Sequence, residues 1–174
     1  WSGRAMALSW RGAAIGDALA SALRAAGYEV SREYYVNDAG TQADTFTDTL
    51  YARYQQQFGR NVDIPKDGYP GEYMADLAKQ IRDEAGDSFL RPEGLPAPSD
   101  LSNLGIELMV RNIRQTLDRF GVRYDHWFSE KSLYDPEGAY GIAMGILREK
   151  GLLVDKEGAL WFSSSELGED KDNV

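Results

Sequence analysis

Two glycines each join a helical pattern to a strand pattern, and this arrangement constrains the fold more than any other feature of the sequence. The helical pattern that starts at Arg11 stops at Gly27, and the alternating residues 28–36 follow at once. A second helical pattern stops at Gly121, before the apolar run 122–128. Glycine ends helices readily because it adopts a left-handed backbone without steric cost. A helical crossover between two strands lets them run parallel, so we predict an α/β fold in which these strands are neighbours.

The first strand alternates apolar and polar side chains with only Arg32 out of place, and its tyrosines are expected to pack rather than to bind a ligand. Asn37 and Asp38 end this strand and are expected to cap the next helix. Asp135–Pro136 predicts the start of a later helix.

Apolar residues at helical spacing predict five core-facing stripes. They are Ile15, Leu19, Ala22, Leu23 and Ala26; Phe46, Leu50, Tyr54 and Phe58; Tyr73, Leu77 and Ile81; Leu104, Leu108 or Met109, Ile113, Leu117 and Phe120; and Ile142, Ala143, Ile146 and Leu147.

Prolines and glycines divide the rest of the chain. Residues 91–100 hold three prolines and predict an irregular linker. The runs 152–154 and 159–162 flank a four-residue turn that ends in Gly158, which predicts a hairpin. Residues 1–10 show neither a clean period nor a cap, so they are interpreted as a tag-like or displaced end.

Composition excludes several classes of function without selecting one. The formal net charge is -9, so an acidic surface should repel nucleic-acid phosphates. The chain has no cysteine and a single histidine, His126, which excludes disulfides, thiolate metal sites and multi-histidine sites. A structural or solvent-facing role is expected for His126. No apolar run reaches membrane-spanning length, and the expected location is cytoplasmic. The common phosphate-loop, dinucleotide, metalloprotease and hydrolase motifs are absent.

A succession of longer strings is more specific than any of these features. In order along the chain they are RGAAIGDALA, GYEVSREYYVNDAGTQ, GYPGEYM, GVRYDHWFSEKSLY, KGLLVDKEGALWF and GEDKDNV. This succession, from Arg11 to Val174, closely resembles the bacterial-type arginyl-tRNA synthetases, which are class I aminoacyl-tRNA synthetases. The resemblance implies a partial Rossmann-like parallel sheet with a mainly helical insertion. It divides the chain into residues 11–42 (first part of a nucleotide-binding catalytic domain), 43–100 (helical insertion) and 101–174 (continuation with a terminal hairpin).

The resemblance also implies a reaction, but this chain differs from the family at two residues that the reaction needs. The family uses ATP, with Mg²⁺, to activate arginine and then transfers the arginine to its tRNA. Two histidines of its HIGH-type signature stand just before the RG of RGAA. Met6 and Ser9 occupy those positions here, and neither can donate as imidazole does to developing phosphate charge. No catalytic or metal-binding residue is therefore assigned to this chain, and the chain alone is expected to bind no cofactor and little tRNA.

Substrate-binding residues are carried over only where the motifs match. Glu130, in WFSEKS, stands where the family places a carboxylate for the guanidinium of arginine, and such pairs can be bidentate. A solvated loop glutamate is the alternative for Glu130. Asn37, Asp38, Gly40 and Gln42 match the family's motif after the first strand, at the end where parallel sheets bind ligands. We expect this motif and Glu130 to face one cleft.

Three functions follow as hypotheses. The first is a fragment of an arginine–tRNA ligase, inactive by itself, whose complete protein is the enzyme. The second is a truncated, non-catalytic synthetase-like binding or interaction protein, which the replaced histidines favour. The third is another class I synthetase, which the EYYVNDAG and WFSE strings argue against.

Overall fold

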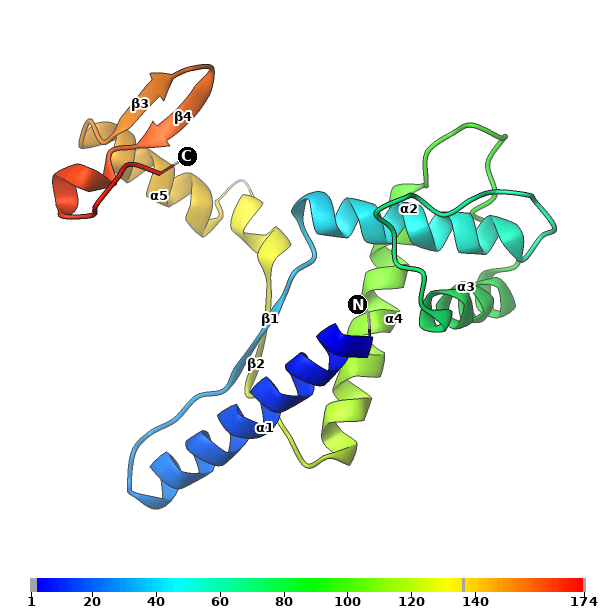
Figure 1. The fold of residues 1–174 in the computed structure, drawn as a ribbon, viewed down its shortest axis with the longest axis horizontal. Coiled ribbons are helices and arrows are strands. Elements are labelled where there is room, and N and C mark those ends of the chain that lie inside the picture. The colour runs from blue at the N-terminus through cyan, green and yellow to red at the C-terminus, as the bar shows by residue number, and fades with distance from the viewer. Residues whose placement is uncertain (1–2, 136, 174) are drawn as a thin grey trace. The chain divides into compact units, whose positions relative to one another are not determined.

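The structure is a computed structural model that describes residues 3–135 and 137–173, with side chains from residue 11 onward. It forms two compact units, Trp1–Phe128 and Ser129–Val174 (Figure 1). In chain order the elements are α1 (Gly3–Ala25), β1 (Glu33–Val36), α2 (Gly40–Gln56), α3 (Glu72–Ala85), α4 (Ser99–Arg119), β2 (His126–Ser129), the 3-10 helix η1 (Glu130–Tyr134), α5 (Ala139–Glu149), β3 (Leu153–Lys156), β4 (Ala159–Phe162) and the 3-10 helix η2 (Ser164–Leu167).

The first unit contains the two predicted neighbouring strands. β1 and β2 pair in a two-stranded sheet and run in the same direction (Figure 1). Both strands are shorter than the alternation predicted, because residues 28–32 and 122–125 lead into them without regular strand structure. The helices and loops of residues 40–119 lie between the two strands in sequence, so the connection that the parallel pair needs is itself a helical bundle.

The core of the first unit lies among α2, α3 and α4. Nine residues form its buried cluster: Leu50, Tyr51, Tyr54, Met74, Leu77, Ala78, Ile81, Leu101 and Leu108. They confirm most of the stripes predicted for these three helices. Phe58 and Phe120 lie just beyond the ends of α2 and α4, and Phe120 is 69% exposed. Gly105 lets α2 and α4 approach closely, because a Cβ atom there would collide with the side chain of Leu50.

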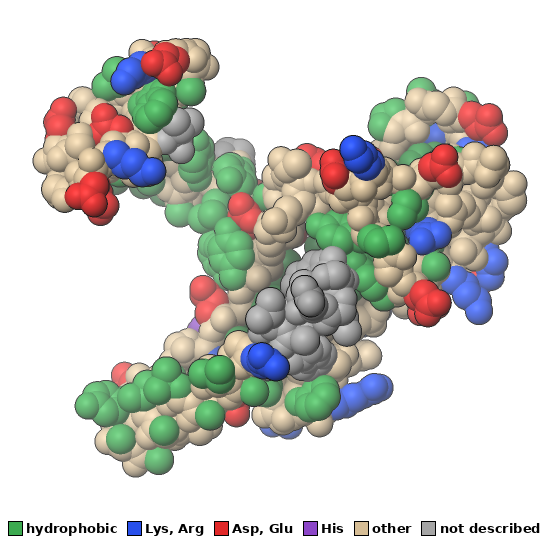
Figure 2. Space-filling view, in the orientation of Figure 1, with side chains coloured by type: hydrophobic (Ala, Val, Ile, Leu, Met, Phe, Trp, Pro, Cys, Tyr) green, Lys and Arg blue, Asp and Glu red, His purple; other side chains and the backbone are tan. Residues whose placement is uncertain are grey.

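Two predicted core-facing stripes are wrong. In α1, Ile15 is 68% exposed and Leu19 is 59% exposed, and apolar side chains gather along this helix (Figure 2). In α5, Ile142 and Ile146 are also exposed. Helical periodicity identifies which face of a helix is apolar, whereas burial also requires a layer that covers the face. Among the described residues, no such layer covers either stripe.

Predicted helix starts need three corrections. Helix α1 begins at Gly3, whereas the helical pattern in the sequence was predicted to start only at Arg11. Helix α2 begins at Gly40, with Ala39 rather than Asn37 or Asp38 at the cap position and no side-chain cap bond. Helix α5 begins only after Gly138, because Asp135 forms a turn in which its carbonyl accepts from the amide of Gly138 (2.7 Å). Pro136 lies outside the described residues.

The second unit contains the predicted hairpin. β3 and β4 pair antiparallel, with Lys156 opposite Ala159. Glu157 (φ 56°) and Gly158 (φ 76°) both have positive φ, which matches the right-handed twist of a two-residue hairpin turn. No helix of the described residues is long and apolar enough to cross a membrane.

Candidate functional site

The motif that follows β1 forms a compact polar turn. β1 ends at Val36, and the amide of Asp38 donates back to the carbonyl of Val36 (3.1 Å). The side chain of Asn37 donates from Nδ2 to Oε1 of Gln42 (3.0 Å), so the structure brings these two predicted site residues together. Gln42 lies in the first turn of α2, and Asp38 is half-buried.

Gly40 makes this turn possible. It has a φ of 70°, in the left-handed region that side chains rarely adopt, and it is the first residue of α2. Its role is therefore conformational: it turns the chain from the end of β1 into the helix that carries Gln42.

Glu130 directly follows β2 and is the first residue of η1. It is half-buried, so it is neither a fully solvated loop residue nor a core residue. Glu130 belongs to the second compact unit, whereas Asn37, Asp38, Gly40 and Gln42 belong to the first. The expectation that Glu130 and this motif face one cleft therefore stays a prediction.

A polar cluster at the other end of the strand pair was not predicted from the sequence. Oδ2 of Asp125 accepts the backbone amide of Arg32 (2.8 Å) and Nη2 of Arg24 (3.0 Å). The carbonyl of Arg32 in turn accepts the amides of Asp125 (2.8 Å) and His126 (3.1 Å). The amide of Arg32 is the main reason that the pKa of Asp125 lies below its ordinary value, and Arg24 contributes further. The one sequence feature that could have indicated this cluster was Arg32, the residue that interrupted the strand alternation.

Aromatic side chains connect the two strands. Tyr34 stacks on Trp127 with ring centroids 4.5 Å apart, and Tyr124 packs edge-on against both rings. The guanidinium carbon of Arg114, on α4, lies 4.5 Å from the Trp127 ring centre. Burial raises the pKa of Tyr34 and of Tyr124. This cluster fits a packing role for Tyr34, as its place in the strand predicted.

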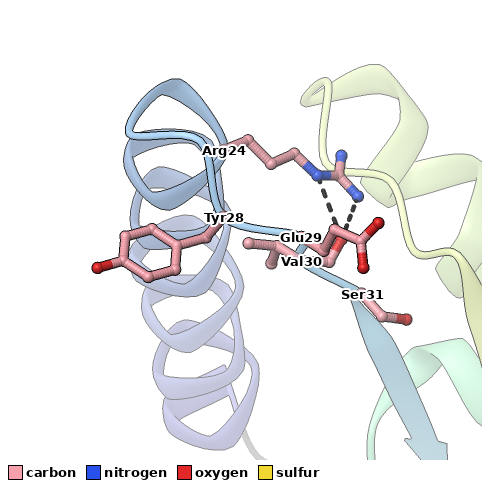
Figure 3. A pocket seen from close by; sticks show the side chains of 5 residues that line it. All are labelled: Arg24, Tyr28, Glu29, Val30 and Ser31. Atoms are coloured by element: carbon pink, nitrogen blue, oxygen red, sulfur yellow. Dashed lines mark hydrogen bonds between the residues drawn. The ribbon is translucent and has the colours of Figure 1, made fainter.

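A shallow pocket lies beside the residues that precede β1, at the strand end opposite the polar motif. It is lined by Arg24, Tyr28, Glu29, Val30 and Ser31 (Figure 3). The guanidinium of Arg24 already donates to the carbonyl of Val30 from Nε (3.2 Å) and Nη2 (2.7 Å). These residues precede the amino end of β1, whereas ligands of parallel sheets bind at carboxyl ends. This pocket is therefore not our candidate site.

Other predicted positions carry less information. The side chains of Met6 and Ser9 lie outside the described residues. His126 is exposed at the start of β2, which agrees with a solvent-facing role.

Comparisons with known proteins point to one family. No family model matches the chain. Arginine–tRNA ligases from Citrifermentans bemidjiense and Carboxydothermus hydrogenoformans are each 45% identical to it over 164 residues, which is 94% of this chain and 29% of each relative. This chain is homologous to a segment of the arginine–tRNA ligases. It spans less than a third of the length of the curated relatives that it matches.

A solved structure agrees with this relationship. A crystal structure from Campylobacter jejuni, described provisionally as an arginyl-tRNA synthetase, is 34% identical and superposes with a TM-score of 0.76. The match covers 94% of this chain and 35% of that one. The resemblance to the arginyl-tRNA synthetases that the sequence strings indicated is thereby confirmed.

Proposed function

We propose that this chain is part of the catalytic domain of an arginine–tRNA ligase that acts in the cytoplasm. The complete protein would activate arginine with ATP and Mg²⁺ and transfer it to arginine tRNA. The observation that carries the proposal is the parallel pair β1–β2 with a polar motif at the carboxyl end of β1, the edge where α/β sheets bind ligands. A Rossmann-like nucleotide-binding sheet is part of the proposal. We assign no described residue to ATP or to Mg²⁺.

The proposed substrate chemistry needs groups that recognise a planar cation. A carboxylate at Glu130 can accept two parallel N–H donors from a guanidinium, which the ammonium of lysine does not offer. The linked amides of Asn37 and Gln42 supply polar atoms of fixed orientation at the end of β1. Glu130 would therefore favour arginine over lysine, and Asn37 and Gln42 are further proposed arginine-binding residues.

Replacing Glu130 tests the proposal in the full-length protein that contains this segment. Glu130→Gln keeps the side-chain shape and removes the charge. Truncating one partner of a buried charge pair costs about 2–5 kcal/mol, so the KM or turnover for arginine should worsen by roughly 30-fold or more. The KM for ATP should change much less. Arginine-dependent ATP–pyrophosphate exchange measures both constants.

Glu149→Gln is the matched control, because Glu149 is an exposed glutamate at the end of α5 in the same unit. It should leave arginine kinetics unchanged. If Glu130→Gln also behaves like wild type, Glu130 does not bind the arginine guanidinium and its assignment fails. If the full-length wild-type protein shows no arginine-dependent exchange, the proposed activity itself fails.

The replaced histidine positions favour a second candidate, a non-catalytic synthetase-like interaction protein. Met6 and Ser9 stand where the family has its signature histidines. The coding sequence distinguishes the two candidates. A reading frame of several hundred codons with a KMSK-like loop supports the enzyme, and a short frame without that loop supports the interaction protein.

A further inference from the structure

The backbone of Arg32 is paired on both sides by Asp125, and this double pairing stands at the entrance to both strands. The Asp125 carboxylate accepts the Arg32 amide, and the Asp125 amide donates to the Arg32 carbonyl, each at 2.8 Å. His126, the first residue of β2, donates to the same carbonyl. A slip of one strand past the other would break all three bonds, so this cluster specifies the register.

The same cluster attaches the strands to α1. Arg24, in the last turn of α1, bonds both Asp125 (3.0 Å) and the carbonyl of Val30 (2.7 Å). The side chain of Arg32 reaches Asp17 (3.1 Å) and Ser21 (3.1 Å), which are also on α1. Asp125 therefore joins α1, the segment before β1 and the segment before β2 at one point.

The register of β1 against β2 depends on the Arg32–Asp125 bonds because both strands are short. β1 and β2 have four residues each, so their ladder contains few hydrogen bonds. A slip by one residue would turn every side chain to the opposite face of the sheet, which would also separate the stacked rings of Tyr34 and Trp127. A slip by two residues would displace the end of β1 by roughly 7 Å. Either slip would move Asn37, which follows β1 directly.

We propose that Asp125 is a positioning residue for arginine binding: its carboxylate fixes the register of β1 against β2 and thereby places the motif Asn37–Gln42. The inference rests on the proposed function, because it assumes that this motif contacts arginine. The essential bond is the one from the Arg32 amide. The Arg24–Asp125 ion pair is about two-fifths exposed on each side, and exposed pairs contribute little.

Three variants of the full-length protein test the proposal. Asp125→Ala removes the acceptor for the Arg32 amide. Misplacement of substrate-binding groups by about 1 Å can reduce rates by as much as 100-fold, so the KM for arginine should rise roughly 10- to 100-fold while that for ATP changes little. Asp125→Asn keeps an oxygen for the Arg32 amide but loses the charge that faces Arg24, and it should stay within about threefold of wild type. Asp118→Ala, which removes a neighbouring exposed aspartate of α4, should have no effect.

Amide hydrogen exchange in the same variants separates this proposal from the proposed function. Asp125→Ala should speed exchange across β1, whereas Asp125→Asn should not. An unchanged arginine KM in Asp125→Ala, equal impairment of the Ala and Asn variants, or unchanged exchange across β1 would each overturn the positioning role. Absence of arginine-dependent activity in the wild type would instead overturn the proposed function, and the exchange data would still decide whether Asp125 sets the register.

Discussion

Tyr73, on α3, carries a hydroxyl group that is buried without a hydrogen-bond partner among the described residues. Burial, with a smaller contribution in the same direction from the neighbouring Tyr69, raises the pKa of Tyr73 from an ordinary value of 10.0 to about 12. A buried hydroxyl without a partner costs stability, because its bonds to water are lost and not replaced.

Replacing Tyr73 by Phe should therefore alter the pH dependence of stability. Between pH 10 and pH 12 the unfolded chain releases the phenol proton while the folded chain retains it, so the free energy of unfolding of the wild type falls as pH rises through this window. The Tyr73→Phe variant has no phenol at this position to titrate, so its free energy of unfolding should fall less over the same pH range. At pH 7 the variant should equal or exceed the wild type by on the order of 1 kcal/mol.

Urea unfolding at pH 7 and pH 11 measures the effect. The stability difference between Tyr73→Phe and wild type should grow in favour of the variant at pH 11. A constant difference at the two pH values would contradict the raised pKa, and a large loss of stability at pH 7 would show that the hydroxyl has a partner in solution.

A specific motif selected candidate site residues from the sequence, and their role in binding arginine stays a prediction. Asn37 and Gln42 were named from the motif after the strand, and the structure bonds them to each other. Asp125 was missed because its partners, Arg24 and the backbone of Arg32, are about 100 residues away along the chain. No local pattern records a bond between a carboxylate and a distant backbone amide.

Among the elements, Gly105 and Gly16 show why one substitution can have opposite effects in two helices. Gly105 is buried in α4, and a Cβ atom there would meet Leu50 and lie 3.4 Å from Phe46. Leu50 is fully buried, so it has little space into which to rotate. Gly16 is exposed in α1, and a Cβ atom there would meet nothing within 4 Å.

Gly105→Ala should destabilise the helical bundle and Gly16→Ala should stabilise α1. Alanine favours a helix over glycine by about 1 kcal/mol, which is the whole effect at Gly16. At Gly105 overpacking of about 1–3 kcal/mol opposes that gain and should exceed it. The midpoint of thermal unfolding, followed by circular dichroism, should fall for the first variant and stay or rise for the second. Shifts of the same sign would refute the close approach of α2 and α4.

The existence and type of most elements followed from the sequence, whereas their lengths and partners did not. Periodicity predicted the helices and the hairpin, because local spacing determines which face is apolar. It could not predict that the stripes of α1 and α5 are exposed, since burial depends on what else packs there. β1 and β2 contracted to four residues each because regular strand pairing is confined to that part of each extended segment.

For the molecule as a whole, the formal charge of -9 predicts weak binding to nucleic-acid phosphates. The chain is homologous to less than a third of the length of the curated relatives. Phosphate binding gains free energy from clustered lysine and arginine side chains, which release counterions. Acidic residues outnumber basic ones by 28 to 19 in this chain. Sequence homology relates the chain to a segment of the arginine–tRNA ligases, and the described fold contributes a two-stranded portion of the proposed sheet.

The 174-residue chain by itself should therefore show no arginine-dependent ATP–pyrophosphate exchange. Losing one preorganised donor to the transition state costs roughly 100- to 1000-fold in rate. Met6 and Ser9 replace two such donors, so the two losses together should place the rate below detection. The measurement compares the chain with a no-protein blank, and an active full-length arginine–tRNA ligase is the positive control. Exchange that depends on arginine and exceeds the blank would show that the described residues activate arginine without the signature histidines, and the catalytic role would then have to be reassigned within this chain.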